Sequence, residues 1–114
     1  MRYVLLLYGQ ETWLDGLSDD ERDAHMQRWG EYDEQMRAAG IGIAGDALDR
    51  TATARTVRGR GKPLVTDGPF AETREQLGGF IEIDVASLDD AIAWAERCPV
   101  LVHGAVEVRP VVAM

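Results

Sequence analysis

The segment from residue 18 to residue 40 constrains the fold more than any other part of the chain. It opens with the motif SDDE, in which Ser18 can accept a hydrogen bond from the amide of Glu21 while the Glu21 carboxylate accepts one from the amide of Ser18. It closes with Gly40, the residue type that most easily ends a helix in a left-handed conformation. These two signals predict one long helix over residues 18–39.

The predicted helix has one apolar face. His25, Trp29, Tyr32 and Met36 recur at steps of four, three and four residues, which places them on the same side of a helix. We expect that side to face the core. His25 has two interpretations, a half-buried core histidine or a proton carrier, and the apolar neighbours favour the first.

Strand-forming segments lie on both sides of this helix. The first is RYVLLLY at residues 2–8, which is almost entirely apolar, as expected of a strand covered on at least one face. The other predicted elements, in chain order, are a strand at 41–48, a hairpin of 53–57 and 63–66, a strand at 77–85, a helix from Ser87 that Pro99 ends, and a strand at 105–109.

The order of elements is therefore β-α-β, a hairpin, and β-α-β again. This order predicts an α+β protein of ferredoxin-like architecture, with an antiparallel sheet and two helices on one of its faces. The other face of such a sheet is bare, and a second copy of the same chain is the simplest cover for it. We therefore expect a homodimer.

Composition narrows the class of protein. The chain has 114 residues, of which 46% are hydrophobic, and this fits a single domain spanning residues 1–114. No apolar run approaches the roughly 20 residues that cross a bilayer, so no membrane partner is expected. The start of the chain lacks a small-residue cleavage pattern, which predicts a cytoplasmic protein. A net charge of −8 should repel phosphate backbones, so direct nucleic-acid binding is not expected.

Neither a metal nor a cofactor is predicted. The two histidines are far apart in the chain and Cys98 is the only cysteine, so no ligand spacing typical of a metal site occurs. Cys98 is interpreted as a small buried residue. The glycines near residue 40 and the turn at 59–62 match neither a dinucleotide fingerprint nor a phosphate-binding loop.

The stretch TDGPFAETREQLGGF at residues 66–80 holds the first candidate site residues. Asp67 can act as a general base or contact a ligand, or it can serve only the tight Asp-Gly-Pro turn, and the turn has slightly more weight. Phe70 is expected in the core or at the dimer interface, and it is a candidate contact for a substrate. Residues 72–75 are expected to form a short, solvated turn of helix.

Three further candidates lie toward the C-terminus. His103 precedes the last strand and is either an acid–base group near neutral pH or a loop histidine with a structural partner. Glu107 and Arg109 are two residues apart and share a sheet face. They can point into a barrel cavity, where Arg109 would bind a carboxylate, or form an ion-pair ladder across strands, and the ladder has slightly more weight.

The string VTDGPFAETREQLGGF, together with the opening RYVLLLYG and the closing EVRP, resembles the DGPF-type branch of the YCII-related proteins. The resemblance runs from Arg2 to Val111. It implies a dimeric α/β barrel of ferredoxin-like protomers. Members of the wider superfamily act on small, often aromatic or lactone substrates, and DGPF-type proteins are companions of extracytoplasmic-function sigma factors.

One departure from this resemblance concerns a His-Asp pair. In YCII-related proteins the histidine lies on the first helix and the aspartate just after it. Counting back from Gly40, that histidine matches a position close to Trp29, which cannot transfer a proton. His25 lies one turn earlier and Asp46 is present, so the pair is either incomplete or shifted by one turn.

Two functions follow from these residues and this resemblance. The first is a small-molecule-binding homodimer that works as a cofactor-free lyase, isomerase or hydrolase. Its catalytic groups would be Asp67 and His103, and its substrate contacts would be Arg109, Glu107 and Phe70. The alternative is a non-enzymatic regulatory module that binds a sigma factor, which the missing histidine and the acidic surface favour.

Overall fold

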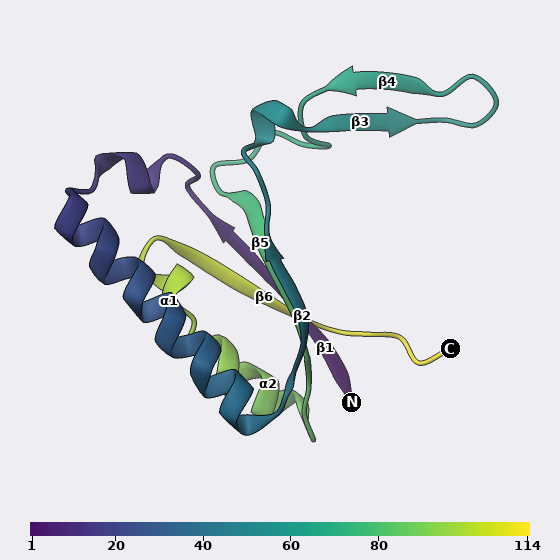
Figure 1. Ribbon diagram of the computed structural model, residues 1–114. Helices are drawn as coiled ribbons and strands as arrows, with labels where there is room; N and C mark the ends of the chain where they lie inside the picture. The colour runs from purple at the N-terminus through teal and green to yellow at the C-terminus, as the bar shows by residue number, and fades with distance from the viewer.

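The computed structural model describes residues 1–114 and is built on a four-stranded antiparallel sheet with two helices on one face (Figure 1). The elements of this body are β1 (Arg2–Gly9), α1 (Asp19–Ala39), β2 (Gly42–Ala47), β5 (Gln76–Asp84), α2 (Leu88–Ala95) and β6 (Gly104–Pro110). The strand order is β2-β5-β1-β6, and every neighbouring pair is antiparallel. This is the ferredoxin-like order, so the predicted fold class is confirmed.

Helix α1 begins and ends as the sequence predicts. The Ser18 hydroxyl accepts a hydrogen bond from the Glu21 amide at 3.2 Å, and the Glu21 carboxylate accepts one from the Ser18 amide at 3.0 Å. At the other end Gly40 has a φ of 68°, and its amide donates to carbonyl groups of the last turn. Three residues of the predicted inner face are buried: His25, Tyr32 and Met36. No helix in the chain is both long enough and apolar enough to cross a membrane.

The core lies between the helices and the sheet. On β1 the alternate side chains of Tyr3, Leu5 and Leu7 point toward the helices and are at most 8% exposed. Alternate burial is the pattern of a strand with one covered face, and it explains the period of two in this segment. The other members of the core are Tyr32, Met36, Ile81, Ile83, Val85, Ala91, Ala95, Cys98 and Val100.

The opposite face of the sheet carries no helix (Figure 1). The strand register places Val4, Leu6 and Tyr8 of β1 on this face, with Phe80 of β5 opposite Leu6. These four side chains are only half-buried. The face therefore has an apolar centre that no element of the protomer covers.

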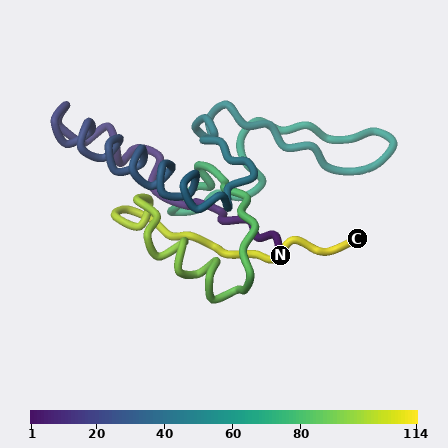
Figure 2. Tube along the Cα trace, turned by 60° about the horizontal axis from the view of Figure 1, so that its bottom comes forward, coloured from purple at the N-terminus to yellow at the C-terminus, as the bar shows by residue number.

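Strands β3 (Arg55–Arg58) and β4 (Leu64–Asp67) form a separate two-stranded sheet that projects from the body (Figures 1 and 2). The predicted hairpin is thus confirmed, although its first strand begins two residues later than expected. Its apolar side chains are open, since Val57, Leu64 and Val65 are 62%, 61% and 57% exposed. A two-stranded hairpin alone is marginally stable in water, so this arm gains little support from its own contacts.

The predicted helical turn after the hairpin is wrong, and of the two places expected for Phe70 the core is excluded while a dimer interface stays a prediction. Residues 72–75 contain bends and no helix. Phe70 does not join the core of the protomer; it is 73% exposed, and the Arg58 guanidinium lies over its ring at 4.6 Å. The Arg58 guanidinium thus gives the exposed Phe70 ring a cation–π contact at the surface.

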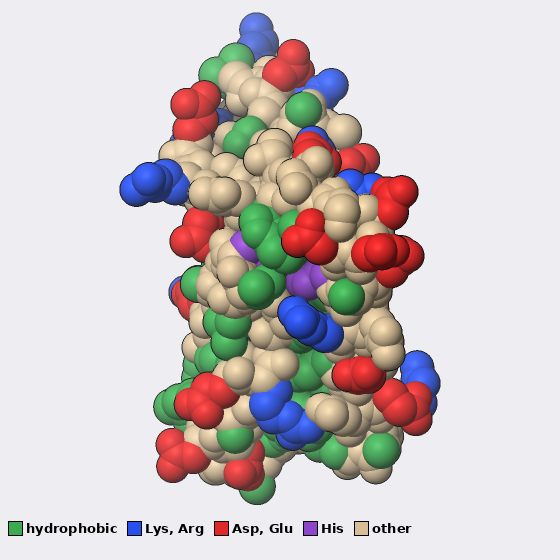
Figure 3. All heavy atoms as spheres, turned by 90° about the vertical axis from the view of Figure 1, so that its left-hand side faces the viewer, with side chains coloured by type: hydrophobic (Ala, Val, Ile, Leu, Met, Phe, Trp, Pro, Cys, Tyr) green, Lys and Arg blue, Asp and Glu red, His purple; other side chains and the backbone are tan.

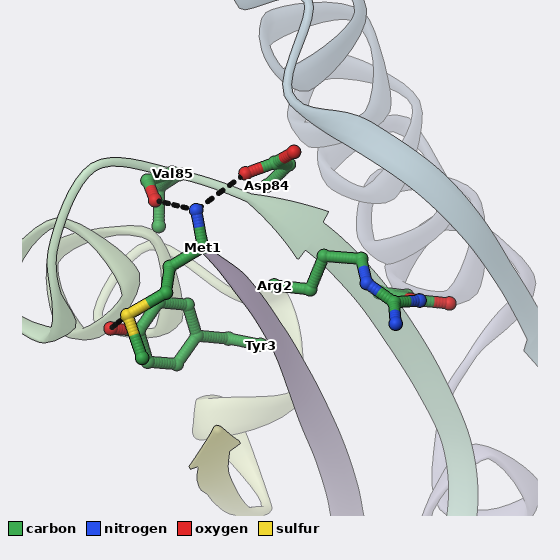
Figure 4. A network of polar contacts seen from close by, with 6 residues as sticks. Met1, Arg2, Tyr3, Asp84 and Val85 are labelled. Carbon is green, nitrogen blue, oxygen red and sulfur yellow. Dashed lines mark hydrogen bonds and ion pairs between the residues drawn. The ribbon is translucent and has the colours of Figure 1, made fainter. Parts of the chain in front are cut away.

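The N-terminus ties the outer end of β1 to the end of β5 (Figure 4). The Met1 ammonium donates to the Asp84 carboxylate at 2.8 Å and to the Val85 carbonyl at 3.0 Å. Arg2 forms an ion pair with Glu82 at 2.8 Å on the neighbouring strand. These contacts are exposed and each contributes little free energy, but together they support the register that directs alternate side chains to the core.

Candidate functional site

A cleft of about 920 Å³ opens between α1 and the β2–β5 side of the sheet. Its volume lies within the range of small-molecule sites, roughly 300–1,000 Å³. Helix α1 contributes His25, Met26, Trp29 and Met36 to its wall, and His103 approaches from the segment before β6. Figure 3 shows the side on which α1 lies, with histidine side chains (purple) beside a group of hydrophobic ones (green).

The cleft exists because its floor is made of small residues. The strand register places Gly45 and Ala47 of β2, and Gly79 of β5, on the face turned toward the helices. None of these residues has a side chain that could fill the space under α1. A Cβ on Gly79 would also lie 3.0 Å from the carbonyl oxygen of Asp46, which confirms a close backbone approach at the Gly-Gly step.

His25 lies in the wall of the cleft and is 5% exposed. Its Nε2 accepts a hydrogen bond of 3.1 Å from the indole Nε1–H of Trp29, one turn later on α1. Its Nδ1 is buried and has no hydrogen-bond partner. The predicted burial of this histidine is confirmed, but only one of its two ring nitrogens is satisfied.

Trp13, on the short 3-10 helix η1 (Trp13–Gly16), connects the two histidines of the chain. Its ring stacks on the imidazole of His103, with ring centres 4.4 Å apart and planes inclined by 9°. It meets the ring of His25 edge to face at 4.9 Å, and the two imidazole centres are 6.1 Å apart. Trp13 could not be recognised from the sequence, because it lies in a short connection with neither a helical nor a strand period.

His103 follows the 3-10 helix η3 (Pro99–Val102), and its ring rests on Gly9 at the end of β1. A Cβ on Gly9 would come within 2.5 Å of Cε1 and 2.6 Å of Nδ1 of the imidazole, so only glycine leaves room for this ring. The Nδ1 of His103 is buried without a partner, whereas its Nε2 has no protein partner and is not enclosed. Nε2 is therefore the atom of His103 that a ligand can reach.

Burial lowers the pKa of both histidines from the ordinary value of 6.5. For His25 the loss of solvation is the largest cause, and the charges of His103 and Arg28 lower the pKa further. For His103 the loss of solvation again dominates, while the carboxylate of Glu75 acts in the opposite direction. Both imidazoles are consequently neutral near pH 7.

Glu75 is the second residue that the sequence analysis missed, since it was assigned to a solvated turn. Its Oε2 is buried and has no hydrogen-bond partner. In the whole chain only three buried side-chain nitrogen or oxygen atoms lack a partner, and they belong to His25, His103 and Glu75. Buried polar atoms are nearly always paired. Two of these three residues line the cleft and the third, Glu75, acts on His103, which marks this cleft as the candidate site.

Of the residues predicted for the site, only His103 lines the cleft. Asp67 ends β4 on the projecting hairpin with its side chain 89% exposed, and Phe70 follows it in the chain. Glu107 and Arg109 lie on the bare face of the sheet, where they form an ion pair with each other at 3.4 Å. The expected convergence of Asp67, His103 and Arg109 on one pocket is therefore not seen within the protomer.

The surroundings of Asp67 are those of a turn. Its carboxylate pairs with the cross-strand Arg55 at 3.0 Å. The next residue, Gly68, has a φ of 94°, its amide donates to the Ala54 carbonyl at 2.8 Å, and its carbonyl accepts from the Thr56 hydroxyl at 2.8 Å. The Asp-Gly-Pro motif thus closes the base of the hairpin.

Cys98 is buried at 3% exposure in the core, as predicted. Burial raises the pKa of its thiol to about 11. The reactive thiolate is therefore scarce near neutral pH, and Cys98 is a packing residue rather than a nucleophile.

The profile of the YCII-related domain matches the chain over residues 1–114. The chain belongs to the YCII-related family. An uncharacterized protein of Rhizobium meliloti (strain 1021) is 38% identical to it over 96 residues, which make up 83% of this chain and 77% of that protein.

Among solved structures, 5-chloro-2-hydroxyhydroquinone dehydrochlorinase from Burkholderia phenoliruptrix AC1100, in complex with 2,5-dihydroxybenzoquinone, is similar with a TM-score of 0.52. The match covers 96% of this YCII-related chain and 92% of that one at 17% sequence identity. At this identity the likeness shows a common fold.

The pair that resemblance to YCII-related proteins suggested, His25 and Asp46, is not assembled here. Both residues line the cleft, but no hydrogen bond or ion pair joins them. The register places Asp46 opposite Phe80, on the sheet face turned away from the helices. In this family member the partner of His25 is Trp29, which stands near the position where a histidine was expected.

Proposed function

We propose that this YCII-related protein binds a small organic molecule in the cleft beside α1 and moves a proton to or from it without a cofactor. The observation that carries the proposal is the state of His103. Trp13 and Gly9 hold its ring, Nδ1 is enclosed, and Nε2 alone is left for a ligand. A fixed imidazole with one open nitrogen is suited to general acid–base work.

Proton transfer by His103 fits its electrostatic surroundings. Loss of solvation lowers its pKa, so the imidazole is neutral near pH 7 and can act as a base. The nearby Glu75 carboxylate favours the imidazolium that forms when the proton is taken up. Cofactor-free lyases, isomerases and hydrolases all use such a step, and the proposal extends to these three classes.

The walls of the cleft favour a flat and largely apolar ligand. Leu7, Met26, Trp29 and Met36 supply apolar surface. Arg37 and Arg50 line the same cleft, each in an ion pair with a carboxylate, beside the acidic side chains of Glu11, Asp33 and Asp49. The similar fold that holds 2,5-dihydroxybenzoquinone suggests that small quinone as the first probe, because it is flat and carries acidic hydroxyl groups.

We further propose that the protein is a homodimer in which the bare faces of two sheets pack together. The apolar centre formed by Val4, Leu6 and Tyr8 supports this arrangement, since contiguous exposed apolar surface is usually covered. Glu107 and Arg109 would then lie between the two sheets. In that enclosed space Arg109 is a suitable partner for a carboxylate.

Thermal shift with 2,5-dihydroxybenzoquinone tests the cleft. We expect the probe to raise the melting temperature of the wild-type protein, because a ligand that binds only the native state stabilises it. Ala47→Leu should abolish this rise by filling the floor, and His103→Asn should weaken it. Asp67→Asn, on the exposed hairpin, is the matched control and should keep the full rise.

Each variant is first melted without the probe, so that a loss of binding is separated from a loss of stability. An equal rise for the wild-type protein and Ala47→Leu would show that the probe binds outside the cleft, and the proposal would fail. If Asp67→Asn instead abolished the rise, the role of ligand contact would belong to Asp67, as the sequence first suggested.

A further inference from the structure

The hydrogen bond between Trp29 and His25 determines where the proton of that imidazole resides. An indole Nε1–H can only donate, so the Nε2 of His25 at 3.1 Å must be the acceptor and carries no proton. A neutral imidazole has one protonated nitrogen. The proton of His25 is therefore on Nδ1, the nitrogen that is buried and has no partner.

The same bond opposes a charged His25. The imidazolium has protons on both nitrogens, and its Nε2–H would face the Trp29 N–H instead of accepting from it. The charged groups around the ring act in the same direction, since Arg28 on α1 and His103 from the facing segment both disfavour a second positive charge. The Glu75 carboxylate acts on His103, and none of the ion pairs of the chain includes His25.

We propose that Trp29 is a positioning residue that holds His25 neutral, with its single proton on Nδ1. His103 then remains the single histidine of the cleft that can take up and release a proton. This second part rests on the proposed function, whereas the first concerns the protein without a ligand. The Nδ1–H of His25 is buried without an acceptor, and the rings of Trp13 and His103 pack against the imidazole that carries it.

The proposal gives a reason for the tryptophan at this position of the helix. A residue there that both donates and accepts would leave either nitrogen of His25 protonated. The indole permits one tautomer only, and it packs edge to face on Tyr32 at 5.9 Å, which fixes the direction of its N–H. Trp29 thus influences proton transfer in the cleft only through its hydrogen bond to His25.

Nitrogen-15 NMR of the two imidazoles in the ligand-free protein tests this inference. His103→Asn identifies the His25 signals by elimination. In the wild-type protein we expect a protonated Nδ1 and an unprotonated Nε2 for His25 near pH 7. Trp29→Phe keeps the aromatic ring but removes the donor, and the Nε2-protonated form that a free imidazole prefers should appear.

Trp94→Phe is the matched control, because Trp94 also contacts Tyr32 but makes no bond to His25. It should leave the His25 signals unchanged. A proton on Nε2 in the wild-type protein would overturn the proposal by itself, even if Trp29→Phe failed to fold. A folded Trp29→Phe protein with an unchanged Nδ1 proton would overturn it as well. Neither result depends on whether 2,5-dihydroxybenzoquinone binds.

Discussion

The body of the protein buries residue types that the β3–β4 hairpin leaves exposed to solvent. Leu5 on β1 is 0% exposed, whereas Leu64 on β4 is 61% exposed. In the body, His25 is buried, His103 is half-buried and the Nδ1 of each is buried without a partner, while on the hairpin Asp67 is exposed and paired with Arg55. A residue of a catalytic type therefore indicates a functional site only where the fold also removes its side chain from water.

The difference has a simple structural origin. β1 is a central strand with neighbours on both edges and helices over one face, so its inward side chains lose their contact with water. β3 and β4 pair only with each other. The hairpin is held by its own ladder, the Arg55–Asp67 ion pair and the hydrogen bonds at its base, and no helix covers either of its faces (Figure 1).

The largest expected effect compares two leucines. Leu5→Ala should lower the free energy of unfolding by about 2–5 kcal/mol, because it removes a fully buried side chain and leaves a cavity. Leu64→Ala should cost less than about 0.5 kcal/mol for the protomer, because the leucine is already exposed. Urea unfolding at low protein concentration measures both values. Similar losses for the two variants would contradict the comparison.

A smaller effect is expected from acid. The pKa values of the two histidines are lowered from about 6.5 in the folded protein. Between the lowered pKa values and about pH 6.5, the unfolded chain therefore binds more protons than the folded one. The free energy of unfolding should consequently fall as the pH drops through this range. The urea midpoint should decrease from about pH 7.5 to about pH 5.5 in the wild-type protein.

His103→Asn is the control for this pH effect, and it should reduce the decrease because one of the two histidines is gone. The lowered pKa values of Glu11, Asp15 and Glu21 act in a more acidic window, below about 4.5, and do not interfere. A wild-type midpoint that stays constant, or rises, on acidification to about pH 5.5 would disprove the burial of these imidazoles.

The smallest effect on the protomer should come from removing the hairpin. Arg55 and Asp67 face each other across the strands, so a short Gly-Ser linker can replace residues 55–67 without moving the body. We expect the free energy of unfolding of the protomer to change by less than about 1 kcal/mol, since no core residue is lost. Light scattering of the same sample measures its mass. A dimer that survives the replacement would place the interface on the sheet alone, and a large loss of stability would show that the hairpin belongs to the body.

Local signals predicted much of the fold. The capping box at Ser18 and the terminal Gly40 are signals that each involve only one or two turns of helix. They predicted both ends of α1 correctly. The alternation in β1 and the Asp-Gly-Pro turn are local in the same sense. These features depend on neighbours in the chain, so the sequence contains them completely.

The groups of the candidate site come from distant parts of the chain, so the sequence could not bring them together. Trp13 follows β1, His25 belongs to α1, Glu75 precedes β5 and His103 precedes β6. Nothing in their local sequence shows that these groups meet. The one site residue that the sequence identified, His103, was found from its residue type and place before the last strand.

The sequence by itself determined the element order, the helix ends, the family and the glycines at turns and close backbone approaches. Each of these depends on residues adjacent along the chain. Only the tertiary structure decided that Asp67 lies on an exposed arm, that the small residues Gly45, Ala47 and Gly79 leave a cleft, and that Trp29 bonds to the histidine one turn before it. Burial and hydrogen-bond pairing are properties of groups brought together in space, and they set which polar atoms remain free for chemistry.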